Sequence, residues 1–178
     1  IGHQSANPSI KGSSKAVLVT GGAGYVGSHT CKYLAKHGFT PVVVDRDLKT
    51  KFKPVEFGPS FDINIPQEIE RLEEIIKRFN ITSCIHFAGS ASVAESVKDP
   101  SQYYKNNVIG TIALLDKLIE CGVKTFVYSS SAATYGDPGM QLCMETDVPN
   151  PISAYGSSKL MMEMICKDYL RAYGLSSV

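Results

Sequence analysis

The chain has no excess of charge of either sign. Its 18 Lys and Arg residues nearly balance its 17 Asp and Glu residues, so the formal net charge is +1. Proteins that bind nucleic acid or an anionic membrane surface usually concentrate positive charge. The composition therefore gives no electrostatic reason to expect either partner, and we expect neither nucleic acid nor membrane.

Long apolar runs are also missing. A membrane-spanning helix needs roughly 20 consecutive apolar residues, and no stretch of the sequence comes near that length. Residues 1–14 are polar and lack the apolar centre of a signal peptide, so we expect a disordered tail or an expression remnant there. Residues 15–178 are long enough for one domain with a proper core.

The cysteines show none of the paired patterns typical of zinc or redox sites. There are five, an odd number, and no C-x-x-C pair occurs among them. In a chain without an export signal this favours free thiols in a reducing compartment, so we expect a cytoplasmic protein. The four histidines lack the spacing of metal ligands, and we predict no metal site. His86, at the end of an apolar stretch, is interpreted as a hydrogen-bonded core histidine.

What the sequence does have is a glycine-rich turn between an apolar strand and a helix. Residues 16–19 form a short apolar run, Gly21, Gly24 and Gly27 follow at intervals of three, and 25–37 has the pattern of a helix. Such a turn directs free backbone N–H groups and the positive end of a helix dipole at one point, which suits a phosphate. The pattern predicts a dinucleotide site, although a tight turn without a ligand would use glycine too.

The rest of the chain alternates between apolar strands and amphipathic helices. The expected strands are 16–19, 41–45, 61–63, 83–89, 124–129 and the start of another at 175–178. The expected helices are 25–37, 66–79 with Pro66 in its first turn and Asn80 after its end, 101–121, and 153–173. This order predicts an α/β fold with a doubly wound parallel sheet, a Rossmann-type NAD-binding domain over 15–178. A strand beginning at the last residues suggests part of a longer protein.

Asp45 ends the second predicted strand, 18 residues after Gly27. At about this distance a dinucleotide fold places a carboxylate that accepts hydrogen bonds from the adenosine ribose hydroxyls. The alternative is a solvated acid at a strand end. Arg46 could hold the 2′-phosphate of NADP, but the Asp45 carboxylate would repel that phosphate. We therefore expect NAD as the cofactor.

Tyr155 and Lys159 lie four residues apart near the start of the last predicted helix, so both face the same way. A nearby ammonium lowers the pKa of a tyrosine toward the working range of a general base. Ser131 follows a predicted parallel strand, where such sheets bind ligands, and its hydroxyl could hold a substrate oxygen. A surface Tyr–Lys pair and an ordinary loop serine are the alternatives, and the glycine turn favours catalysis.

Together these motifs resemble the 4-epimerases of UDP-glucose and UDP-galactose, a family of extended short-chain dehydrogenase/reductases. The resemblance covers residues 15–178 and rests on GGAGYVGSHT at 21–30, HFAG at 86–89 with ESV at 95–97, YYKNNV at 103–108, SSSA at 129–132 with YGD at 135–137, and YGSSKL at 155–160. It implies epimerisation at C4 of a UDP-hexose through a transient 4-keto sugar, with NAD storing the hydride. It also implies a homodimer paired through the helices at 101–121 and 153–173. The family's C-terminal strands and substrate domain are absent from this chain.

The resemblance also implies roles for individual residues. Tyr25 and Val26 would contact the pyrophosphate, and Asp62 and Ile63 would flank the adenine. The catalytic set would be Ser131, Tyr155 and Lys159. The cofactor-binding set would be Gly21, Gly24, Tyr25, Val26, Gly27, Asp45, Arg46, Asp62, Ile63, Phe87, Ala88, Gly89, Asn106, Tyr155 and Lys159.

Two alternatives stay open. Another nucleotide-sugar enzyme of the same superfamily, such as an epimerase of a different UDP-sugar, a decarboxylase or a dehydratase, would share these motifs. Dehydratases carry an Asp–Glu pair directly after the active-site hydroxyl residue, whereas this chain has Ala132 and Ala133, which cannot transfer protons. The second alternative is an NAD-binding module that is inactive on its own.

Overall fold

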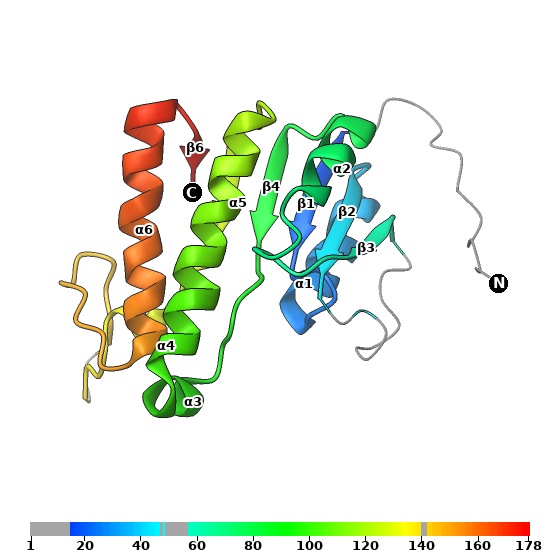
Figure 1. Cartoon of the computed structure of the whole chain (residues 1–178). Helices are drawn as coiled ribbons and strands as arrows, with labels where there is room; N and C mark the ends of the chain where they lie inside the picture. The colour runs from blue at the N-terminus through cyan, green and yellow to red at the C-terminus, as the bar shows by residue number, and fades with distance from the viewer. Residues whose placement is uncertain (1–14, 47, 49–56, 140–141) are drawn as a thin grey trace.

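A computed structural model describes residues 15–46, 48, 57–139 and 142–178 (Figure 1). The tail predicted over 1–14 lies outside the described residues. Within them the strands are β1 (Ala16–Thr20), β2 (Thr40–Asp45), β3 (Ser60–Asp62), β4 (Ser83–His86), β5 (Thr125–Tyr128) and β6 (Ser176–Ser177). They confirm the predicted strands, including the one at the end of the chain.

These strands form one parallel sheet in the order β3-β2-β1-β4-β5-β6. From β1 the chain adds β2 and β3 on one side. It then crosses to the other side of β1, where it adds β4, β5 and β6. This is the strand order of a doubly wound, Rossmann-type sheet, and it confirms the predicted fold class. Such a sheet binds ligands where the order reverses, here between the carboxyl ends of β1 and β4.

The helical segments are α1 (Tyr25–Lys36), α2 (Arg71–Phe79), α3 (Val93–Lys98), α4 (Pro100–Tyr103), the π-helical η1 (Tyr104–Ile109), α5 (Gly110–Glu120), the 3₁₀-helical η2 (Ala132–Thr134) and α6 (Ala154–Tyr173). α1 and α6 confirm two predicted helices. Ser153 caps the start of α6, and Gly174 ends it in a left-handed conformation with φ of 70°. α3 was not predicted.

The helix predicted over 66–79 begins later than expected. α2 starts at Arg71, so the placement of Pro66 in its first turn is wrong. Residues 65–70 form turns in which the Glu68 carboxylate accepts the Asn64 N–H at 2.9 Å. That side chain satisfies a backbone donor locally, and a helix is not needed there. Asn80 ends α2 in a left-handed conformation, as predicted.

The helix predicted over 101–121 is helical from Pro100 to Glu120, but its middle is the π-helical η1. In this stretch the Thr111 hydroxyl donates to Asn107 O at 2.7 Å, so a side chain shares a carbonyl that the backbone of a regular helix would use. π-helical turns occur often at functional sites, because they change the direction of the side chains they carry. Asn106 and Asn107 both lie on this turn.

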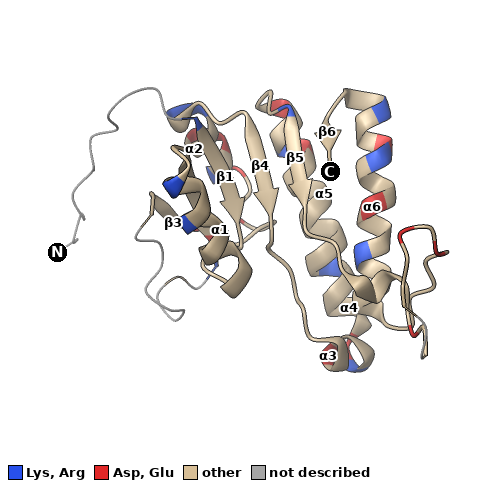
Figure 2. Cartoon of the chain, turned by 180° about the vertical axis from the view of Figure 1, so that it is seen from behind, with Lys and Arg blue, Asp and Glu red and all other residues tan. Residues whose placement is uncertain are grey.

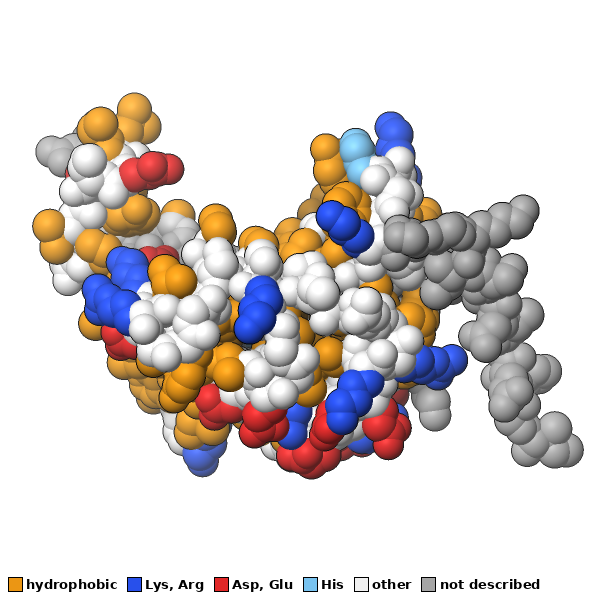
Figure 3. Space-filling view, turned by 90° about the horizontal axis from the view of Figure 1, so that it is seen from above, with side chains coloured by type: hydrophobic (Ala, Val, Ile, Leu, Met, Phe, Trp, Pro, Cys, Tyr) orange, Lys and Arg blue, Asp and Glu red, His pale blue; other side chains and the backbone are white. Residues whose placement is uncertain are grey.

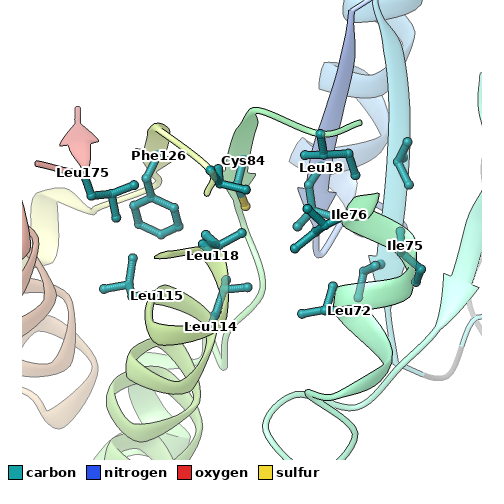
Figure 4. Packing of buried hydrophobic residues seen from close by; sticks show 14 of the residues in the cluster. Leu18, Leu72, Ile75, Ile76, Cys84, Leu114, Leu115, Leu118, Phe126 and Leu175 are labelled. Carbon is teal, nitrogen blue, oxygen red and sulfur yellow. The ribbon is translucent and has the colours of Figure 1, made fainter. Parts of the chain in front are cut away.

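Helices cover the two faces of the sheet unequally. α2, α5 and α6 lie on one face, and α1 lies on the other over β1 and β2 (Figure 1 and Figure 2). The main core fills the first layer, where Phe126 of β5 packs with Leu115 and Leu118 of α5, and Leu18 of β1 lies beside Ile76 of α2 (Figure 4). A smaller cluster under α1 contains Val17, Val19, Cys31 and Val43.

On the α1 side, β4 and β5 have no helix over them among the described residues (Figure 2). The space-filling view is hollowed there, between α1 and the segment that follows η2 (Figure 3). Val127 of β5 points to this face and is 36% exposed, although the neighbouring Phe126 is completely buried on the opposite face. The sheet is therefore fully packed on one side only.

Phe126→Ala should lower the free energy of unfolding by about 3–5 kcal/mol, because it removes a large side chain that is 0% exposed in the main core. Val127→Ala, on the same strand but on the bare face, should cost less than about 1 kcal/mol. Urea denaturation of the two variants measures both values. Equal losses would contradict this division of the sheet into a packed and a bare face.

Candidate functional site

The glycine turn between β1 and α1 packs backbone against backbone. Gly21 has φ of 70°, a left-handed conformation that favours glycine, and its N–H donates to Val44 O at 2.8 Å. A Cβ atom on Gly21 would lie 2.5 Å from Ala88 N, and one on Gly27 would lie 2.3 Å from Gly21 O. The turn therefore brings the end of β1, the start of α1 and the segment after β4 together, and leaves no room for side chains.

The start of α1 is open to an anion. Gly24 is the residue before the helix, no side chain caps it, and the first turn carries no acidic residue. The backbone N–H groups of that turn have no intrahelical partners, and the positive end of the helix dipole lies behind them. This end of α1 adjoins the carboxyl edge of the sheet, the place where phosphates bind in such folds.

Asp45 lies beside this turn, at the end of β2. Its side chain is buried, and Oδ2 accepts the Ala23 N–H at 3.0 Å. This bond holds the carboxylate against the glycine turn. Asp45 and the adjacent Arg46 both line the cleft that opens here. The predicted ribose-binding acid is therefore at the predicted position relative to the turn.

A cleft of about 150 Å³ opens at the carboxyl edge of the sheet. It adjoins a second hollow of about 550 Å³, with which it shares Arg46, Asn64, Ile65 and Asn106. The predicted cofactor residues that line the cleft are Gly21, Gly24, Asp45, Arg46, Ile63, Phe87, Ala88, Gly89 and Asn106. Residues from five separate segments of the chain thus meet where the sequence predicted a cofactor.

Six predicted cofactor residues do not line this cleft, and two of them, Tyr155 and Lys159, lie on α6. Tyr25 and Val26 begin α1, and their side chains are 83% and 56% exposed, so they would reach a pyrophosphate through their backbone N–H groups. Gly27 is buried against Gly21. Asp62 ends β3, where its carbonyl accepts from Arg71 Nη1 at 3.0 Å. Their contacts with a cofactor remain predictions.

Sequence reasoning missed three residues that line the cleft, Val44, Asn64 and Ile65. Val44 directly precedes Asp45, and the other two directly follow Ile63. Residues next to one another at a strand end often line the same cleft. The position of these three residues beside Asp45 and Ile63 is therefore the signal by which they could have been predicted.

A buried asparagine holds the segment that follows β4. Asn107 accepts the Ser90 N–H through Oδ1 at 2.8 Å and donates to Ser90 O through Nδ2 at 3.0 Å. Nδ2 also donates to Ser158 Oγ on α6 at 3.2 Å. The adjacent Asn106 donates to Ser90 Oγ at 3.0 Å. Asn107 therefore ties the wall of the cleft to α6, a role hidden in the sequence because its partners are 17 and 51 residues away.

Lys159 is buried at the end of β5. Its Nζ donates to Ser129 O at 2.8 Å, and the residue is only 6% exposed. The rings of Tyr128 and Tyr155 lie beside it, with their centroids 4.9 Å and 5.8 Å from Nζ. Burial lowers the pKa of Lys159 from 10.5 to about 8, so the ammonium still predominates at pH 7. The site thus holds one buried positive charge between two tyrosines.

Ser131 lies where β5 leads into η2. Its Oγ accepts the Ala133 N–H at 3.2 Å, so its own proton is available for donation. η2 packs tightly on the start of α6, because a Cβ on Gly156 would lie 2.3 Å from Ala133 O. Ala133 is two residues from Ser131, and Gly156 adjoins Tyr155. This contact brings Ser131 and Tyr155 into the same region.

Tyr155 is half-buried in the first turn of α6. Its ring meets that of Tyr103 edge to face, with the centroids 6.5 Å apart. In the described part of the chain no hydrogen bond joins its hydroxyl to Ser131 or Lys159, so the Lys159 charge acts on it through space.

His86 is a neutral, fully hydrogen-bonded imidazole. Thr111 Oγ1 gives its one proton to Asn107 O, so it must accept from His86 Nε2, 3.0 Å away. Nδ1 then accepts the proton of the Thr20 hydroxyl. Burial, with a smaller effect of the Lys159 charge, lowers the pKa of His86 from 6.5 to about 3. The interpretation of His86 as a core histidine is confirmed.

The five cysteines all lie in described segments and are free thiols. Burial raises the pKa of Cys31 and Cys166 to about 11, so both stay protonated and unreactive at neutral pH. Over the described ranges, no group of three or more His, Cys, Asp or Glu side chains is placed to hold a metal ion. None of the helices in those ranges is both long and apolar enough to cross a bilayer.

Fold and site together define an α/β protein with a dinucleotide-type cleft and a Ser–Tyr–Lys group beside it. Comparison with protein families gives the same class: residues 17–178 match the NAD dependent epimerase/dehydratase family. This match extends from β1 to the last residue and includes every residue of the cleft. The chain belongs to that family.

Individual relatives are similar over nearly the whole chain. It is 42% identical over 164 residues to UDP-glucose 4-epimerase of Rhizobium leguminosarum bv. trifolii and 43% identical over 162 residues to that of Rhizobium meliloti (strain 1021). The solved structure of UDP-glucose 4-epimerase from Brucella ovis in complex with NAD is 44% identical, with a TM-score of 0.86. These matches cover 92%, 91% and 92% of this chain, but 50%, 49% and 50% of the other chains. The chain spans about half the length of the curated relatives it matches.

Acid should destabilise the fold through His86. The unfolded chain takes up a proton near pH 6.5, whereas the folded site resists protonation until about pH 3. The contribution of neutral His86 to the free energy of unfolding is therefore complete above pH 6.5 and is lost as the pH falls toward 3. Urea midpoints between pH 7 and 4 should decline less steeply in His86→Asn than in the wild type. Nitrogen-15 NMR at pH 5 should show a proton on Nε2 only, and an imidazolium signal at that pH would contradict the assignment.

Proposed function

We propose that the chain binds NAD in the cleft at the carboxyl edge of the sheet. The glycine turn and the uncapped start of α1 fit a pyrophosphate, and Asp45 fits the hydroxyls of the adenosine ribose. A carboxylate at that position disfavours a 2′-phosphate, which supports NAD rather than NADP. The description of the family names NAD, and the Brucella ovis structure is a complex with NAD.

The proposed reaction is epimerisation at C4 of UDP-glucose and UDP-galactose by a full-length protein that contains this chain. The observation that carries this proposal is the group beyond the carboxyl end of β5: Lys159, buried and charged, beside Tyr155, with the Ser131 hydroxyl brought to the same region by η2. The relatives named UDP-glucose 4-epimerase add support.

In this mechanism the residues of the chain move one proton and hold one oxygen. Tyr155, beside Lys159, acts as the base and takes the proton of the sugar 4-hydroxyl, and Ser131 donates a hydrogen bond to the same oxygen. NAD, held by the glycine turn and Asp45, would supply a reversible acceptor for the hydride of C4. Tyr155 returns its proton to the C4 oxygen, which becomes the hydroxyl of the epimer. Lys159 keeps its charge beside Tyr155 throughout.

η2 favours this reaction over dehydration. Expelling the 6-hydroxyl would need a further acid and base next to Ser131. The residues there are Ala132 and Ala133, whose methyl groups can neither donate nor accept protons. This supports the epimerase proposal against the dehydratase alternative.

We also propose a homodimer and a cytosolic location. The resemblance to the 4-epimerases implies pairing through the outer faces of α5 and α6. Apolar side chains on or near those faces are exposed, among them Ile109, Met161 and Met164. Free cysteines are typical of a reducing compartment, which supports the cytosol.

The decisive test compares the chain as printed with a full-length version of the same length as its relatives. Both are supplied with NAD and UDP-galactose, and the formation of UDP-glucose is followed by NMR. We expect both proteins to bind NAD and the full-length version to convert the sugar. A full-length protein without turnover would overturn the epimerase proposal, and a decarboxylated or 4-keto-6-deoxy product would assign the chain to one of the other nucleotide-sugar enzymes.

Tyr155→Phe in the full-length version should lower kcat by about 10²- to 10⁴-fold, because it removes the group that takes the proton. The Kd for NAD should change less than about three-fold, because only a hydroxyl is lost at the edge of the cleft. Tyr173→Phe, at the exposed end of α6, is the matched control and should leave kcat unchanged. If Tyr155→Phe keeps wild-type turnover, Tyr155 is not the base.

A further inference from the structure

α6 holds the segment before Ser131 at two points. Ser129 O accepts from Lys159 Nζ at 2.8 Å, and the next residue, Ser130, donates its hydroxyl proton to Glu163 Oε1. Lys159 and Glu163 are four residues apart, so they lie on the same face of α6, one turn from each other. An ammonium and a carboxylate on successive turns thus hold two successive serines.

Ser131 itself makes no hydrogen bond to α6 in the described part of the chain. Its Oγ accepts from Ala133 N, and its carbonyl accepts from the N–H and the hydroxyl of Thr134. The position of Ser131 relative to α6 therefore depends on what flanks it. On one side are the Ser129 and Ser130 bonds, and on the other is the close contact of η2 with Gly156.

The Glu163 carboxylate is directed to the serine segment, where its Oε1 accepts the proton of the Ser130 hydroxyl. A charge-assisted hydrogen bond of this kind is stronger than one between neutral groups. Without the Ser130 donor, the partly buried Glu163 carboxylate would lose a hydrogen bond that offsets the cost of its burial.

We propose that Glu163 is a positioning residue of the site: through Ser130 it fixes the serine segment, so that the Ser131 hydroxyl meets the substrate oxygen that Tyr155 deprotonates. This inference rests on the proposed epimerase function. Glu163 touches neither sugar nor cofactor in this scheme. Its effect on the reaction comes from geometry, because a misplacement of about 1 Å can cost about 100-fold in rate.

The test uses the full-length version and separates the hydrogen bond from the charge. Glu163→Ala removes both, Glu163→Gln keeps an acceptor oxygen for Ser130, and Ser130→Ala removes the donor. Asp168→Ala, which removes an exposed acid of the same helix, is the matched control. The double variant Ser130→Ala/Glu163→Ala shows whether the two residues act as one unit.

In the turnover assay we expect Glu163→Ala and Ser130→Ala each to lower kcat by about 10- to 100-fold, with KM changed less than about three-fold. The double variant should lose no more than either single variant. Glu163→Gln should recover most of the rate, and Asp168→Ala should match the wild type. A wild-type rate in Glu163→Ala, a Glu163→Gln variant as slow as Glu163→Ala, or additive losses in the double variant would overturn the proposal.

Amide hydrogen exchange gives a readout that needs no substrate. The N–H groups of Ala133 and Thr134 both bond to Ser131, so they report how firmly the segment is held. Glu163→Ala and Ser130→Ala should speed their exchange by about 10-fold relative to the wild type, and Glu163→Gln should not. Unchanged exchange in both alanine variants would overturn the proposal. A wild-type protein that converts no UDP-sugar would instead defeat the proposed function, while the exchange rates would still decide whether Glu163 holds this segment.

Discussion

Contact between backbone and backbone at the glycine turn is the constraint on which the rest of the site depends. The missing side chains of Gly21 and Gly27 let α1 begin directly against the end of β1 and let the backbone of Phe87 and Ala88, after β4, lie where a Cβ of residue 21 would be. The strand order reverses between β1 and β4, and this contact forms the bottom of the cleft at that point. Asp45 then reaches the turn from β2 and bonds to it. The phosphate and ribose contacts that we propose would thus both follow from one packing arrangement.

The group formed by Ser131, Tyr155 and Lys159 is organised by α6 in a similar way. Gly156 allows η2 to rest on the helix, and Tyr155 and Lys159 follow on its inner face. His86, buried nearby, stays neutral because burial lowers its pKa, and two threonines satisfy its ring nitrogens. Lys159, itself buried, places its positive charge 5.8 Å from the centre of the Tyr155 ring.

Much of the fold and of the cofactor cleft was predictable, because it depends on residue patterns that are local in the sequence. Apolar runs and glycine spacing predict β1, α1 and the fold class, and the residue that ends β2 is predicted as Asp45. The start of α2 was misplaced because the Glu68 side chain satisfies the backbone at Asn64, an interaction that periodicity does not show. Asn107 and Glu163 were missed for a different reason. Each acts through a hydrogen bond to a serine 17 or 33 residues away, and only the folded chain brings those partners together.

On the bare face of β4 and β5, the exposure of a side chain depends on whether a further segment packs there. Parallel sheets are normally buried on both faces, but here α1 does not extend over β5, the strand that carries Val127 (Figure 2). In this chain Val127 is 36% exposed, so we expect polar replacements there to cost little stability. In a protein of the relatives' length, any further segment that packs on this face would bury Val127 at a contact between that segment and the sheet. A substitution of Val127 would then weaken this contact, so its cost in stability would be larger in the longer protein than in this chain.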